Sequence, residues 1–71
     1  MNIEMVQFTS DHVIPENGKY LVKAVSTSHL KTEQFLQARC VKSYNEKHKR
    51  WETSVDVSNQ TVLLISKIPV V

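Results

Sequence analysis

Hydrophobic and polar residues alternate along several stretches of this chain with the period of two that is typical of half-buried β-strands. The clearest stretch is residues 19–26, which is rich in β-branched and aromatic residues. One of its faces carries Tyr20, Val22 and Ala24, whereas Lys23 interrupts the other. This stretch therefore predicts a strand with one apolar face.

A turn is predicted immediately before this strand, at Pro15-Glu16-Asn17-Gly18. Proline fixes φ at the second position of a turn, and Gly18 can adopt a positive φ. The apolar-rich residues 3–8 lie further upstream. We therefore expect a strand on each side of residues 15–18.

Residues 33–47 admit two interpretations. They contain many good helix formers and no glycine, so a helix at about 33–47 would give an α+β fold. However, Leu36, Ala38 and Cys40 also alternate with less apolar neighbours, which favours a strand over residues 34–44.

The sequence that follows favours the strand. Residues 50–57 alternate from Trp51 to Val57 in the pattern of a half-buried strand. A strand at 34–44 and another at 50–57, joined by residues 45–49, would make a hairpin with an ordinary loop length.

The last apolar segment, residues 61–68, is nearly continuous and β-branched, which predicts a central strand buried on both faces. Pro69 should end it, because proline lacks the backbone donor that a sheet needs. The expected fold is all-β: a small antiparallel meander of four to five strands in sequence order, curled into a partly open barrel.

Length and composition predict a single small globular domain covering residues 1–71. The chain is 41% hydrophobic and 23% charged, which suits a folded domain with little room for a deep catalytic cleft. Its one cysteine, Cys40, lies among apolar residues and should be a small buried hydrophobe. No basic, apolar leader is visible at the amino terminus, so we expect a cytoplasmic protein.

Positive charge gathers in the second half of the chain. Residues 1–35 carry three cations and four acidic residues (3 − 4 = −1), whereas residues 36–71 carry six cations and three acidic residues (6 − 3 = +3). The densest run lies between two aromatic residues. The candidate contact residues for a nucleic acid or another partner are Arg39, Lys42, Tyr44, Lys47, Lys49, Arg50 and Trp51.

This basic run also has two interpretations. The cations could contact phosphates while Tyr44 and Trp51 stack on unpaired bases. Alternatively, the run is a solvated turn between two aromatic anchors, with Trp51 closing one end of the core. The second interpretation is favoured because Glu46 and Glu52 lie inside the patch. Removal of a buried Trp51 would destabilise the fold by about 3–5 kcal/mol.

No motif for catalysis or metal binding is present. The three histidines and Cys40 lack the short spacings that preorganise a zinc site, and a chain with one glycine has no glycine-rich phosphate loop. We therefore expect no metal, no cofactor and no enzymatic activity. The leading hypothesis is a non-enzymatic protein-interaction module; the alternatives are a weak nucleic-acid-binding domain using the hairpin at 39–51, and an enzyme.

The expected partner is a protein, which includes a second copy of the chain bound through an exposed edge strand. Nucleic acid is the alternative partner. A membrane is not expected, because apolar runs such as residues 62–65 are far too short to span one.

Three short motifs resemble a small bacterial and phage-associated family of unknown function. The resemblance covers residues 13–69; its members share a Pro-x-x-Gly-x-Tyr/Val-Leu-Val opening, an Ala-Arg-like pair before a polar turn and Trp, and a closing Val-to-Pro strand. The chain has Ile65 where that family usually has Trp. The resemblance implies a small β-rich domain, often encoded by prophages and mobile elements, with no known activity, cofactor or catalytic residue. The matching residues are Pro15, Gly18, Tyr20, Leu21, Val22, Ala38, Arg39, Trp51, Val62 and Pro69.

Overall fold

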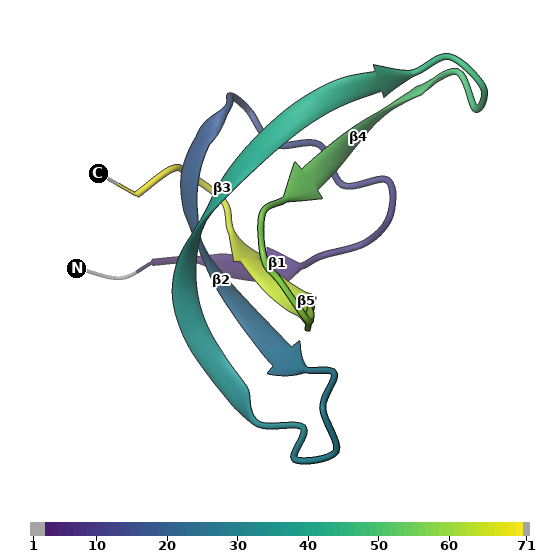
Figure 1. Ribbon diagram of the computed structural model, residues 1–71. Helices are drawn as coiled ribbons and strands as arrows, with labels where there is room; N and C mark the ends of the chain where they lie inside the picture. Colours follow the sequence, from purple (N-terminus) through teal and green to yellow (C-terminus); the bar gives the residue numbers. More distant parts are fainter. Residues whose placement is uncertain (1–2, 71) are drawn as a thin grey trace.

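A computed structural model describes residues 3–70, which form one curled antiparallel sheet without a helix (Figure 1). The all-β prediction is therefore confirmed, and the alternative of a helix at about 33–47 is wrong, because that segment is mostly a single long strand. The strands are β1 (Met5–Gln7), β2 (Gly18–Ser26), β3 (Glu33–Asn45), β4 (Arg50–Val55) and β5 (Gln60–Ser66).

The strands lie in the order β1-β5-β2-β3-β4. Strands β2, β3 and β4 form the predicted antiparallel meander. The prediction that all strands lie in sequence order is wrong, however. Strand β5 pairs with the free edge of β2, and β1 pairs with the other edge of β5. This return places Ile65 opposite Val22, so that two fully buried side chains meet on the same face of the sheet.

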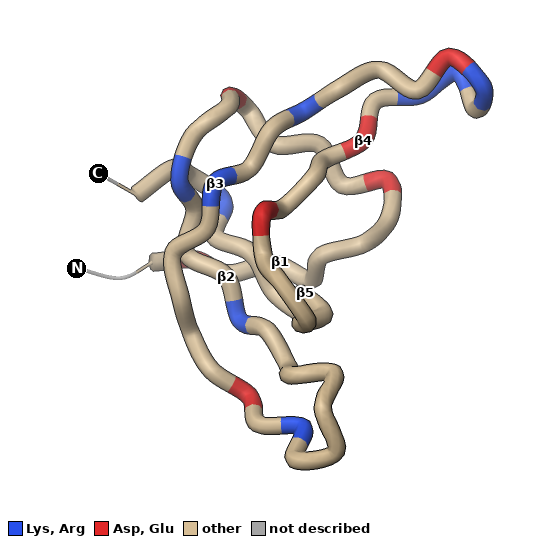
Figure 2. The backbone as a smooth tube through the Cα atoms, in the orientation of Figure 1, with Lys and Arg blue, Asp and Glu red and all other residues tan. Residues whose placement is uncertain are grey.

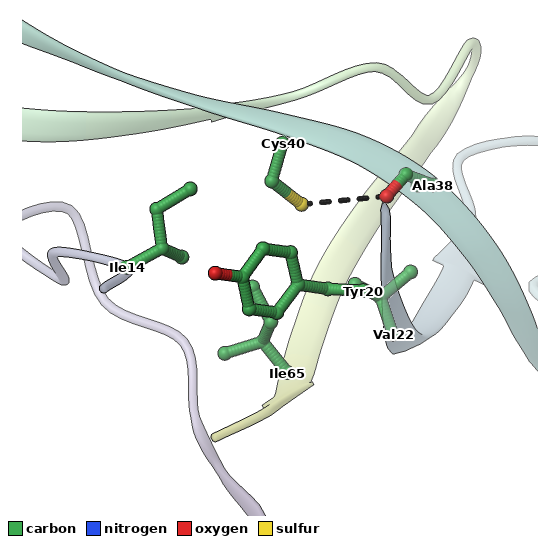
Figure 3. Close-up of a cluster of buried hydrophobic side chains, with 6 residues drawn as sticks. All are labelled: Ile14, Tyr20, Val22, Ala38, Cys40 and Ile65. Atoms are coloured by element: carbon green, nitrogen blue, oxygen red, sulfur yellow. Dashed lines mark hydrogen bonds between the residues drawn. The ribbon is translucent and has the colours of Figure 1, made fainter. Parts of the chain in front are cut away.

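The inner face of the curl holds the hydrophobic core (Figure 3). Tyr20, Val22 and Ala24 are all buried, as the alternation of residues 19–26 predicts. The predicted alternation of β3 is confirmed too, since Ala38 and Cys40 are buried on this face. Half-buried residues pack around this cluster: Val6, Phe8, Leu36, Val55, Val57 and Val62.

Upstream of the turn, the strand expected within residues 3–8 forms as β1, but it ends at Gln7 and does not reach Pro15. Residues 8–17 are a loop that covers the open side of the curl (Figure 1). Ile14 is 1% exposed and fills the core from this loop. Its backbone N–H donates to the Thr53 hydroxyl (3.2 Å), which in turn donates to the His12 carbonyl (2.7 Å). A short sheet this curved needs a cover over its inner face, and the loop provides it. Gly18 begins β2 without the positive φ expected of a turn.

Strand β5 is an inner strand of the sheet, but it is not buried on both faces as expected. Its residues alternate: Ile65 is fully buried, whereas Leu63 is 36% exposed. The reason is that no second layer packs on the outer face of the sheet over the described residues (Figure 1).

Strand β3 is thirteen residues long and has different neighbours along its two halves. Strand β2 pairs with it from Glu33 to Cys40, and β4 pairs with it from Cys40 to Asn45. Only Cys40 has a register partner on both sides, Gly18 in β2 and Val55 in β4. The far half of β3 therefore leaves the body of the sheet together with β4, as a projecting hairpin (Figure 1).

We predict that Tyr20→Phe destabilises the protein by about 1 kcal/mol, because its buried hydroxyl donates to the Glu16 carbonyl at 2.6 Å and ties the covering loop to the core. Urea unfolding followed by circular dichroism measures the loss. Tyr44→Phe is the matched control, since the structure gives the Tyr44 hydroxyl no partner among the described residues, and it should change stability little.

Equal effects of the two substitutions would contradict this role of Tyr20.

Burial also raises the pKa of the Tyr20 phenol. The neutral phenol is therefore favoured in the folded state, and its stabilising effect is present below the phenol's ordinary pKa and lost as the pH rises through the raised pKa. Tyr20→Phe should remove that part of the alkaline loss of stability.

Candidate interaction surface on the projecting hairpin

The turn of the β3–β4 hairpin is shaped by Asn45, the last residue of β3. Its side-chain oxygen accepts hydrogen bonds from the backbone N–H groups of Lys47 (3.0 Å) and His48 (3.3 Å). An Asx side chain of this kind stabilises a turn locally. Lys49 then adopts a left-handed conformation, with a φ of 53°, before β4 begins at Arg50. The predicted hairpin and its turn are confirmed.

Tyr44 and Trp51 pack against each other at the base of this turn. They are register partners, and their rings meet edge to face with the centroids 5.6 Å apart. The pair lies on the inner face of the hairpin but beyond the core, so that Tyr44 is 48% exposed and Trp51 is 50% exposed. The prediction that Trp51 closes the core is therefore wrong: β4 leaves the body of the sheet at this end, and half of the Trp51 side chain stays exposed.

Arg50 is held on the opposite, outer face of the hairpin. Its guanidinium forms an ion pair with Glu52 at 3.1 Å, and Glu52 also accepts a hydrogen bond from the Asn45 side-chain amide at 2.8 Å. The Asn45 hydrogen bond, and then Arg50, hold the pKa of the Glu52 carboxyl below its usual value. Glu52 is thus charged at neutral pH and partly neutralises Arg50.

The remaining cations lie at separate positions along the backbone of β3 and its turn (Figure 2). Lys42 lies on the inner face at the base of the hairpin, where its ammonium donates to the Pro15 carbonyl (3.2 Å) and its backbone N–H donates to the Asn17 side chain (2.9 Å). Arg39 lies before the hairpin, on the outer face. Lys47 and Lys49 occupy the exposed turn.

The structure therefore brings together only part of the predicted contact set. Tyr44 and Trp51 meet on one face, with Lys47 and Lys49 in the turn beside them, while Arg39 and Arg50 lie on the other face and Lys42 is tied to the covering loop. Sequence reasoning missed Asn45 and Asn17, which position the turn and the base of the hairpin. Their only signal was the general preference of asparagine for turns.

Cys40 has no features of a nucleophile. Its side chain is fully buried at the centre of the core, and its thiol lies 3.6 Å from the Ala38 carbonyl oxygen (Figure 3). Burial raises the pKa of this thiol, which disfavours the reactive thiolate. Across residues 3–70 no three histidine, cysteine or acidic side chains converge in a way that could hold a metal ion.

Comparison with family models, with curated proteins and with solved structures finds no match to this chain. Within the described part of the chain, no helix has the length and hydrophobicity that a membrane crossing requires.

We predict that Trp51→Ala lowers the free energy of unfolding by only about 1 kcal/mol, because it removes an exposed aromatic pair and not a core side chain. The emission of Trp51, the only tryptophan in the chain, should also report a solvent-exposed indole in the folded wild-type protein. Urea unfolding followed by circular dichroism measures the stability. A loss of about 3–5 kcal/mol, with blue-shifted emission, would place Trp51 in the core instead.

Proposed function

We propose that this protein is a non-enzymatic interaction module that binds another protein through the projecting end of the β3–β4 hairpin. The observation that supports this is the exposed Tyr44–Trp51 pair, whose rings pack edge to face and yet are about half accessible to solvent. Tryptophan and tyrosine are enriched at the centres of protein interfaces, where a large rigid side chain contributes binding energy at a small entropic cost.

Charge favours a protein partner over a nucleic acid. Binding to nucleic acid draws most of its affinity from several cations that contact phosphates together. Here Arg50 is paired with Glu52, Lys42 donates to Pro15, and Arg39 lies on the other face. This leaves Lys47 and Lys49 near the aromatic pair, which suits the polar rim of a protein interface.

A single-stranded nucleic acid is the second candidate. The supporting observation is that two lysines occupy the turn joining the strand ends that carry two exposed aromatic rings, on which bases could stack. Such binding would be weak and steeply dependent on salt.

A bacterial or mobile-element origin and a cytoplasmic location are part of this proposal. The first is supported by the resemblance carried by residues such as Pro15, Tyr20 and Trp51. The second is supported by Cys40, a free cysteine that the core keeps buried.

The interaction is tested by affinity capture with the full chain as bait, in parallel with Tyr44→Ala/Trp51→Ala. We expect the wild type to retain a discrete protein that the double variant loses, because the aromatic contact area is gone. Leu30→Ala is the matched control: Leu30 is 74% exposed and lies far from the hairpin in sequence. This variant should retain the partner.

A partner that the double variant retains as well as the wild type would contradict the assignment of the surface. Fluorescence anisotropy with single- and double-stranded oligonucleotides, at low and moderate salt, tests the second candidate. Binding that falls steeply with salt and is lost in Lys47→Glu/Lys49→Glu would replace the protein partner with a nucleic acid.

A further inference from the structure

The first half of β3 has an open edge. Strand β2 pairs with one side of residues 33–40, while the other side has no neighbouring strand until β4 reaches Cys40. Immediately after β4, the Asp56 N–H donates to the Arg39 carbonyl at 2.9 Å. Residues 33–37 therefore have a strand on one side only.

The direction of the free backbone groups follows from three hydrogen bonds. The Arg39 carbonyl points toward the β4 side, whereas the Thr32 carbonyl and the Lys42 N–H point toward the β2 side. In an antiparallel sheet, successive residues direct their N–H and C=O groups to alternate sides. Glu33, Phe35 and Gln37 thus present their N–H and C=O groups to the open edge.

This edge lacks the features by which sheets usually block unwanted pairing. Residues 33–37 contain neither lysine nor proline. The one charge, on Glu33, is paired with Lys23 at 3.3 Å, and the same ammonium lies 5.8 Å from the centre of the Phe35 ring. Phe35 is 60% exposed beside this edge. By contrast, β4 carries the Arg50–Glu52 ion pair and β1 has only three residues.

We propose that this open edge pairs with the same edge of a second copy of the chain, antiparallel and across a two-fold axis at Phe35. Phe35 then pairs with the partner's Phe35, and Glu33 pairs with the partner's Gln37. All the free N–H and C=O groups of the stretch gain partners, because a two-fold axis makes an antiparallel edge complementary to itself. No two like charges lie opposite each other within residues 33–37.

The position of the axis is fixed by two constraints. A hydrogen-bonded pair must join two residues that both direct their N–H and C=O groups to the edge, which here are odd-numbered residues. The sum of the two residue numbers in a pair is therefore even, and a change of register changes this sum in steps of two. The next register toward β4 would place the partner's Glu33 opposite Arg39, where Asp56 already lies. The register centred on Phe35 fills the free stretch and stops before Asp56.

The test is the mass of the full chain in solution, measured by sedimentation equilibrium over a range of concentrations. The interface is small, so we expect a weak dimer whose mass rises from one chain toward two as concentration increases. Phe35→Lys places two lysines opposite each other and should weaken the dimer by about tenfold or more. Circular dichroism confirms that each variant is folded.

Phe35→Pro is the second variant. It removes an N–H that faces the open edge and has no hydrogen-bond partner among residues 3–70. A sheet tolerates proline at such a position, and this variant too should weaken the dimer. Trp51→Ala is the control and should dimerise like the wild type, because the hairpin end is a separate surface. Two results would overturn the proposal: a wild-type chain that stays monomeric at every concentration, or a dimer that is as stable in both Phe35 variants as in the wild type. After the first result, a strand of another protein would be the remaining candidate to pair with this edge.

Discussion

The length of β3 is the constraint on which the rest of this structure depends. The strand extends beyond both of its neighbours, and the two neighbours overlap only at Cys40. Each half of β3 therefore has a paired edge and an edge without a neighbouring strand. Both surfaces proposed for binding follow from this offset: the hairpin end beyond the core, and the open edge before Arg39.

Cys40 lies where the two halves meet, and its burial links the offset to stability. Its side chain contributes to the same core as Tyr20 and Ile14, so the point at which β3 changes partners is also the point at which the covering loop closes over the sheet. The hydrogen bonds of Thr53 and Lys42 fasten that loop to the base of the hairpin. The hairpin can project because its base is fixed in this way, while its end lies beyond the core and leaves Tyr44 and Trp51 about half exposed.

Local pattern was enough to predict the strands but not their surroundings. The alternation of Tyr20, Val22 and Ala24 specifies a face of the sheet, and the structure buries that face. Burial of Trp51 was wrongly predicted, because alternation says which face a residue lies on and not whether another segment covers that face. The strand expected before the turn stops at Gln7 and does not reach Pro15, for a related reason: Ile14 is buried from a loop, and burial from a loop leaves no periodic signal. The return of β5 to β2 is a long-range pairing that no local turn signal specifies.

Amide hydrogen exchange along β3, measured by NMR on a dilute sample, tests the change of partner at Cys40 most directly. Before Cys40, the amides that face β2, those of Gln34, Leu36 and Ala38, should be protected, while those of Glu33, Phe35 and Gln37 exchange quickly. After Cys40 the pattern should reverse, with protection at Val41, Ser43 and Asn45. Uniform protection along the whole strand, or an alternation that does not reverse at Cys40, would contradict the account.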